Sequence, residues 1–115
     1  MRRKTHNLLR RLRDTLHVAR YTSAGRLVPK RKRGLRAGSV ILRPGTSMPW
    51  HSTKEREELI IALAGRVHLD VEDAPGRRRQ TVLSEGRCAL LPPRTPHAVS
   101  NHSRRTARYL YVTGK

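Results

Sequence analysis

Short alternations of apolar and polar residues, separated by glycine and proline, fill the chain from residue 35 to its end. Residues 67–72 alternate Val or Leu with His, Asp or Glu, which predicts a strand with one buried and one solvated face. Residues 39–42, 80–83 and 109–112 are further predicted strands, with a hairpin loop at 73–79 and a tight turn at 84–86. Many short strands with this punctuation predict an all-β sandwich or jelly-roll barrel.

The segment 58–63 is largely apolar on both faces of its predicted strand. One face carries Glu58, Ile60 and Ala62, and the other carries Leu59, Ile61 and Leu63. This pattern is typical of a strand that is covered on both sides. A buried carboxylate at Glu58 is costly without a partner, and a metal cation would be such a partner.

The first 34 residues follow a different pattern. Leucines 8, 9, 12 and 16 and Ala19 recur at helical spacing, which predicts an amphipathic helix over residues 7–19. The basic run 30–34, Lys-Arg-Lys-Arg-Gly, then reads as a connector. We therefore divide the chain into a basic, partly helical N-terminal arm at 1–34 and a barrel at 35–115.

Charge is concentrated in the N-terminal part of the chain. The whole chain has a formal charge of +18, and residues 1–36 carry 13 Lys and Arg against one acid, Asp14. Such clusters provide phosphate contacts, so binding of nucleic acid or another polyanion through the arm is one hypothesis. The four aromatic residues are not interleaved with the basic run, which argues against base stacking.

Length and composition set further bounds. A chain of 115 residues forms one small domain with a modest core. The single cysteine, Cys88, excludes an intrachain disulfide framework, is expected to be buried, and fits a reducing cytosol. We find no apolar run long enough for a transmembrane helix and no secretory signal, so we expect a cytoplasmic protein without membrane contact.

Two blocks of the sequence carry the candidate chemistry. The first reads Gly45, five residues, His51-x-Thr53, four residues, Glu58, six residues, Gly65. The second reads Gly86, five residues, Pro92-x-Arg94, two residues, His97, three residues, Asn101. Over residues 35–113 this pair resembles the motifs of the cupins, small barrels whose inward side chains hold one metal ion. Thr53 stands where the family has a second histidine, and Arg94 stands where it has glycine.

The resemblance implies a cupin double-stranded β-helix, a jelly-roll barrel, with one divalent transition metal held by His51, Glu58 and His97. Thr53 shares a strand face with His51 and would occupy the fourth position. Glu57 points away unless the register slips by one residue. A 2-His-1-carboxylate set suits Fe(II) or Zn²⁺, and the sequence does not distinguish Fe, Mn, Ni, Co and Zn.

Four other residues of note are not expected to bind the metal. His68 and His102 are expected to face solvent, and Trp50 is expected to point away from His51 into a packing or interface role. Arg94 is interpreted as a solvated charge that could also reach an anionic ligand at the barrel mouth.

Three hypotheses about function follow. The protein is a metal-dependent cupin enzyme acting on an unknown small molecule, a non-catalytic cupin that binds a small ligand, or a polyanion-binding protein that works through its arm. The first two fit the motif, and metal binding is the favoured interpretation. Apolar faces on the 58–63 strand and on the arm also predict a homodimer, because a small barrel cannot cover both alone.

Overall fold

The computed structural model of the protein describes residues 16–30 and 34–115, and these residues form nine β-strands. In chain order they are β1 (Gly25–Arg26), β2 (Arg36–Leu42), β3 (Ser47–Ser52), β4 (Glu57–Ala64), β5 (Arg66–Ala74), β6 (Arg77–Ser84), β7 (Cys88–Leu91), β8 (Pro96–Ser100) and β9 (Ala107–Gly114). One sheet has the order β1-β2-β9-β4-β7 and the other β3-β8-β5-β6, with antiparallel pairing throughout. The predicted all-β jelly roll is confirmed.

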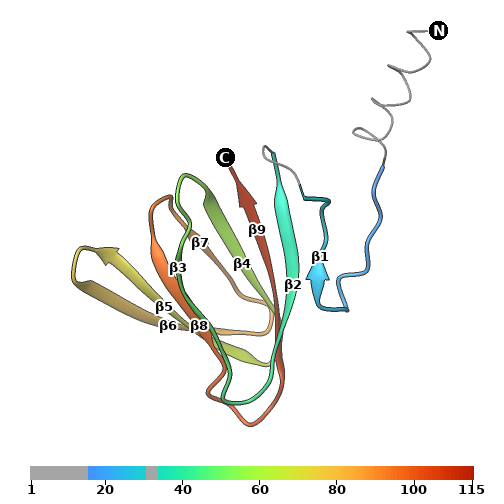
Figure 1. The fold of residues 1–115 in the computed structure, drawn as a ribbon. Helices are drawn as coiled ribbons and strands as arrows, with labels where there is room; N and C mark the ends of the chain where they lie inside the picture. Colours follow the sequence, from blue (N-terminus) through green and yellow to red (C-terminus); the bar gives the residue numbers. More distant parts are fainter. Residues whose placement is uncertain (1–15, 31–33) are drawn as a thin grey trace, which may run out of the picture.

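The core lies between the two sheets, which form opposite layers in Figure 1. Its buried apolar members are Leu42, Ile60, Ala62, Val67, Leu69, Leu83, Leu91, Val99, Ala107 and Tyr109. They come from both layers and follow the period-two alternation of their strands. On β4 the predicted alternation is confirmed, because Glu58, Ile60 and Ala62 are buried and the residues between them are only half-buried.

Several element boundaries differ from the sequence prediction. The loop predicted at 73–79 is shorter, because β5 extends to Ala74 and β6 begins at Arg77. Strand pairing runs through the charged residues there, since both faces of an exposed hairpin tolerate polar side chains. Cys88 is exposed rather than buried, because β7 is an edge strand with a solvated outer side.

The predicted helix of the arm is not confirmed. Residues 16–19, the part of it that the structure describes, have no regular secondary structure, and Leu16 is exposed. Residues 7–15 lie outside the described residues. Within the described ranges the fold contains no helix, and hence none long and apolar enough to cross a membrane.

The end of the arm is attached to the barrel. Strand β1 pairs with β2, with Gly25 opposite Ser39 and Arg26 opposite Gly38 (Figure 1). The Leu27 N–H continues this pairing by donating to the carbonyl of Ala37 at 2.9 Å. Residues 25–27 of the predicted arm are therefore an edge of the first sheet.

One motif glycine has a clear steric role. Gly65 turns the chain between β4 and β5 with a positive φ of 71°. A Cβ added there would lie 3.0 Å from the carbonyl oxygen of Thr106. The residue thus meets both the backbone conformation and the close approach that favour glycine.

The motif asparagine is also structural. Asn101 is fully buried, and its amide donates to the carbonyls of Leu42 and Arg105 at 2.9 and 2.7 Å. Its side-chain oxygen accepts from the backbone and the hydroxyl of Ser103. These bonds satisfy the whole amide, so Asn101 fixes the loop between β8 and β9.

Candidate metal centre

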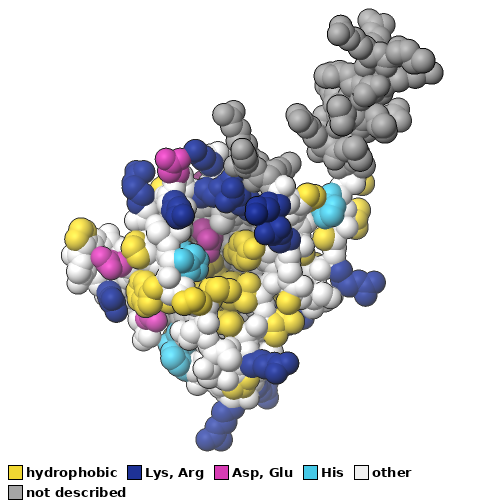
Figure 2. All heavy atoms as spheres, viewed as in Figure 1, with side chains coloured by type: hydrophobic (Ala, Val, Ile, Leu, Met, Phe, Trp, Pro, Cys, Tyr) yellow, Lys and Arg dark blue, Asp and Glu magenta, His cyan; other side chains and the backbone are white. Residues whose placement is uncertain are grey.

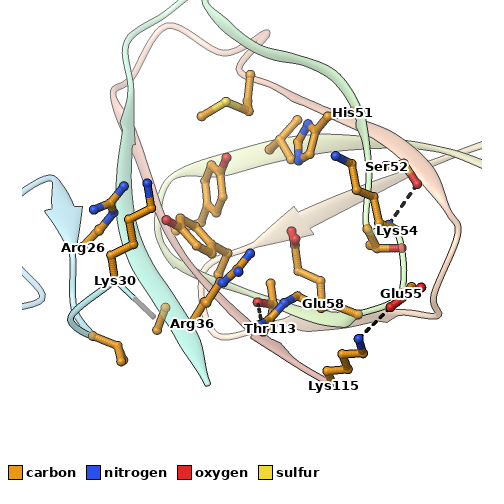
Figure 3. A pocket seen from close by; sticks show the side chains of 18 of the residues that line it. Arg26, Lys30, Arg36, His51, Ser52, Lys54, Glu55, Glu58, Thr113 and Lys115 are labelled. Carbon is orange, nitrogen blue, oxygen red and sulfur yellow. Dashed lines mark hydrogen bonds and ion pairs between the residues drawn. The ribbon is translucent and has the colours of Figure 1, made fainter. Parts of the chain in front are cut away.

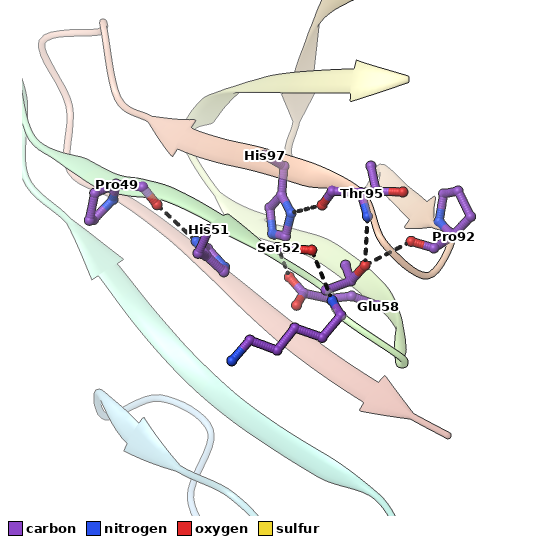
Figure 4. A network of polar contacts seen from close by, with 9 residues as sticks. Pro49, His51, Ser52, Glu58, Pro92, Thr95 and His97 are labelled. Carbon is purple, nitrogen blue, oxygen red and sulfur yellow. Dashed lines mark hydrogen bonds and ion pairs between the residues drawn. The ribbon is translucent and has the colours of Figure 1, made fainter. Parts of the chain in front are cut away.

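Three strands bring the predicted ligands together between the sheets. His51 on β3 pairs directly with His97 on β8, and their ring centroids are 4.2 Å apart. Glu58 enters from β4 of the opposite sheet (Figure 4). One ligand atom from each of the three side chains lies within 4.8 Å of the others. The structure therefore gathers His51, Glu58 and His97 at one point.

An irregularity in β3 gives His51 its direction. The pairing of β3 with β8 shifts between Met48 and His51, and both of these side chains line the cavity described below. In a regular strand, residues three apart face opposite sides. The bulge at Pro49 and Trp50 supplies the extra residue that turns both inward, and proline is tolerated there because it need not donate to the ladder.

The hydrogen bond of each histidine sets its tautomer. Nδ1 of His97 lies 3.0 Å from the carbonyl oxygen of Thr95, and Nδ1 of His51 lies 2.8 Å from that of Pro49. A carbonyl oxygen only accepts, so Nδ1 must carry the proton in both rings. In the neutral imidazoles Nε2 then bears the lone pair, as metal ligation requires.

A neutral His97 ring would leave the Glu58 carboxylate without a cationic partner. Nε2 of His97 is 3.3 Å from Oε2 of Glu58, but the geometry is not that of a hydrogen bond, and Nε2 is buried without another partner. An imidazole lone pair facing a carboxylate is unfavourable unless a proton or a metal ion lies between them. This buried nitrogen without a hydrogen-bond partner is the reason that His51, Glu58 and His97 fit a divalent metal.

The spacing of the donors also fits an ion. Ligand atoms with metal bonds of about 2.0–2.2 Å lie at most about 4.4 Å apart. The observed spread of up to 4.8 Å is close to that limit. The three donor atoms would have to move closer together to bind one ion.

The electrostatics of the pair favour a positive charge. Burial, the largest single effect, lowers the pKa of the His97 imidazole. The Glu58 carboxylate and the Thr95 carbonyl outweigh burial together, so the pKa of His97 is raised above its ordinary value. His97 is fully buried and Glu58 is nearly so, so their attraction is weakly screened.

Thr53 is held by other contacts. Its buried hydroxyl donates to the carbonyl of Pro92 at 2.9 Å and accepts the Thr95 N–H at 3.0 Å (Figure 4). These bonds join the turn after β3 to the loop between β7 and β8. A role of Thr53 as a metal ligand stays a prediction. Its contacts indicate that Thr53 positions Thr95, whose carbonyl oxygen in turn contacts the His97 ring.

The other predicted residues lie outside the group. Glu57 is exposed on the opposite face of β4, as expected. Trp50 is exposed, with the Arg78 guanidinium 4.7 Å from its ring centroid. His68 contacts the ring of His102 with centroids 4.5 Å apart, away from the gathered ligands.

His51 and Glu58 line a cavity of about 820 Å³ (Figure 3). Its apolar wall includes Met48 and Val99, and Tyr109 and Tyr111 of β9 add phenol rings. Burial raises the pKa of Tyr109, and the Glu58 charge raises it further, so this phenol stays protonated. A protonated phenol beside a carboxylate can donate a hydrogen bond to an acceptor in the cavity.

Sequence reasoning missed these tyrosines and the charged rim of the cavity. The sequence does carry a signal for the tyrosines. Residues two apart on a strand share a face, so Tyr109, Tyr111 and Thr113 of β9 are expected on one side of the sheet. The basic side chains that line the cavity are Arg26, Lys30, Arg36, Lys54, Arg56 and Lys115. Figure 2 shows Lys and Arg crowded above a hollow with hydrophobic, acidic and histidine side chains.

Comparisons with known proteins agree with this fold. A family described as the cupin domain matches residues 38–113. A cupin domain of Schizosaccharomyces pombe Cnp3 superposes with a TM-score of 0.68 at 16% identity, covering 80% of this chain and 59% of that one. The protein TT1209 from Thermus thermophilus superposes with a TM-score of 0.66 at 25% identity, covering 84% of this chain and 90% of that one.

An oxalate oxidase structure superposes with a TM-score of 0.67 at 16% identity, covering 71% of this chain and 42% of that one. The chain thus spans about three fifths of the Cnp3 structure and about two fifths of the oxidase. No protein of curated function matches the chain by sequence.

Proposed function

The chain belongs to the cupin family, and on that premise we propose that it binds one divalent transition metal through His51, Glu58 and His97. The observation that carries this proposal is the buried Nε2 of His97, which faces the Glu58 carboxylate without a hydrogen bond. Both histidines hold Nδ1 against backbone carbonyls and leave Nε2 for the ion. Three protein ligands leave coordination positions for water or an oxygen ligand.

The function supported best is metal-dependent binding of a small molecule in the barrel. A bound divalent metal supplies Lewis acidity to an oxygen group of the ligand. The chain positions that ligand between apolar and phenolic walls, and Tyr109 can donate a hydrogen bond to it. The same centre serves a metal-dependent enzyme or a non-catalytic ligand-binding protein, and fold alone does not decide between them.

Elemental analysis of protein purified without chelators tests this proposal. We expect about one equivalent of metal, or uptake of one equivalent of Fe²⁺, Mn²⁺, Ni²⁺ or Zn²⁺ on titration. The variants His51→Ala and His97→Ala should lose most of this metal, because each removes a ligand. Glu57→Gln is the matched control for Glu58→Gln and should keep it. Protein that takes up none of these ions would overturn the proposal.

Polyanion binding by the arm is a second hypothesis, which rests on its charge. Residues 1–36 carry twelve more positive than negative charges. If the arm binds nucleic acid, the affinity should fall steeply with salt and show no sequence preference. Binding that tolerates high salt would contradict this hypothesis.

A further inference from the structure

The basic arm contributes side chains to the rim of the metal cavity. Arg26 lies on β1 and Lys30 follows it, and both line the cavity. Lys54 extends from the turn between β3 and β4 on the other side of the opening, with Glu58 between the two sides (Figure 3). Every lysine in the described part of the chain, Lys30, Lys54 and Lys115, lines this cavity.

The pairing register fixes the direction of Arg26. It pairs with Gly38 on β2, Gly38 pairs with Tyr111 on β9, and Tyr111 pairs with Ile60 on β4. Partners in one antiparallel row project to the same face of a sheet. Ile60 is fully buried between the sheets, so the row directs Arg26 toward the inner face, on the same side as Glu58.

Two further contacts hold the arm in this place. The Leu27 N–H donates to the Ala37 carbonyl at 2.9 Å, and the Ser39 hydroxyl donates to the Tyr21 carbonyl at 2.8 Å. Both bonds join the segment around Arg26 to β2. The position of Arg26 therefore follows from sheet formation, and Lys30 lies four residues farther along the same segment.

The rim has more positive than negative charge. Six basic and two acidic side chains line the cavity. Of the acids, Glu55 pairs with Lys115 at 2.6 Å, and Glu58 faces His97. Within the described ranges, Arg26, Lys30 and Lys54 have no acidic partner. Like charges around one opening repel each other and attract an anion into it.

We propose that Arg26, Lys30 and Lys54 select a small dianionic ligand for this cavity. One anionic group of the ligand lies toward His51, Glu58 and His97, and the second lies among the three cations. The placement of the first group rests on the proposed metal function, whereas the placement of the second rests on the rim alone. Carboxylate and phosphate share the required chemistry, because Lys and Arg bind both.

Calorimetric titration of the full-length protein tests the selection, first metal-free and then loaded with Zn²⁺. The probes are malonate, acetate, the neutral malonamide and inorganic phosphate. We expect malonate or phosphate to bind more tightly than acetate and malonamide in both states. Tighter binding of malonate identifies a dicarboxylate, and tighter binding of phosphate identifies a phosphorylated ligand.

Variants that remove the same number of charges distinguish anion binding by the rim residues from attraction of the anion by the overall positive charge of the protein. The double variant Arg26→Gln, Lys30→Gln and the single variant Lys54→Gln should weaken dianion binding, the former by roughly tenfold. The control Arg43→Gln, Arg104→Gln removes two exposed charges that do not line the cavity, and it should change binding less than twofold. An equal loss in the control, or equal binding of malonate and malonamide, would overturn the inference.

Metal uptake and dianion preference are separate measurements, so each can fail without the other. Zn²⁺ uptake with no preference for dianions would remove the inference and keep the metal site. A dianion preference without metal uptake would remove the metal site and keep the charge selection.

Discussion

Tyr111 lies over Gly38, in the space that a side chain at position 38 would occupy. The two residues are partners in the pairing of β2 with β9, and the phenol extends across the glycine on the inner face. Gly38 therefore makes room for one wall of the cavity.

Substitution Gly38→Ala should displace the Tyr111 ring. We expect a loss of about 1–3 kcal/mol in the free energy of unfolding, typical of overpacking. Gly114→Ala is the control, because its added Cβ meets no atom within 4 Å and its φ is not positive. Chemical denaturation of both variants gives the comparison, and equal stabilities would contradict this account of the glycine.

Two substitutions at Thr53 separate ligation from positioning. Thr53→Val leaves the buried Thr95 N–H without its acceptor, so we expect a loss of about 1–3 kcal/mol in unfolding free energy with metal content unchanged. Thr53→His should lose similar stability in the metal-free protein but bind metal more tightly, because it adds an imidazole. Metal titration checks both, and loss of metal in Thr53→Val without any loss of stability would show that the hydroxyl is a ligand rather than a support for Thr95.

The raised pKa of His97 predicts opposite pH trends for metal-free and metal-loaded protein. Protonated His97 is stabilised by Glu58 in the folded state, so its contribution is fully present below the ordinary pKa of 6.5. That contribution is lost as the pH rises through the raised folded value. Metal binding needs the neutral ring, so metal affinity should increase over the same range.

Thermal unfolding of the protein and of His97→Gln between about pH 5 and pH 8 measures this difference. Without metal, the advantage of the protein over the variant should shrink as pH rises. With Zn²⁺ it should grow. A pH-independent difference in both states would show that the pair of His97 and Glu58 does not titrate.

Arg94 has a left-handed backbone conformation with φ of 55°, at the position where the family motif has glycine. Arg94→Gly should relieve a conformational cost of about 1–2 kcal/mol, partly offset by the greater freedom of glycine in the unfolded chain. We expect a net gain of up to about 1 kcal/mol. Arg94→Ala keeps the strain and removes the charge, so a similar gain in Arg94→Ala would refute the backbone explanation.

The outer face of β4 and its neighbours predicts a homodimer. Leu59 pairs with Leu90 on β7 and with Val112 on β9, and Leu90 is 64% exposed. A second copy of the chain would cover this apolar face. Leu90→Glu should shift sedimentation toward the monomer, whereas Val82→Glu, on β6 of the other sheet, should not. A wild-type protein that sediments as a monomer would contradict the dimer.

The cupin resemblance and local spacing were sufficient to predict that the three candidate ligands lie together. His51, Glu58 and His97 stand at motif positions, and the period-two alternation of β4 assigns Glu58 to the inner face and Glu57 to the outer one. The motif positions specify turns and strand faces, which depend on residues close in sequence. The turns and strand faces are therefore retained although Thr53 and Arg94 depart from the motif.

The rim of the cavity could not be predicted in the same way. Arg26 and Lys30 lie in a segment whose composition indicates a solvated basic arm, yet β1 pairs with β2 and brings them to the barrel. This pairing depends on backbone hydrogen bonds, which leave little signal in side-chain pattern. The Thr53 bonds to Pro92 and Thr95 are equally non-local.

The shortness of β1 has a kinetic consequence. This strand has two residues, at an edge of its sheet, and such elements open at a free energy far below that of global unfolding. Because the segment that carries Arg26 and Lys30 depends on this strand, brief fraying of β1 would widen the entrance while His51, Glu58 and His97 stay fixed. The residence time of a bound molecule would then follow the rate at which two residues detach and return.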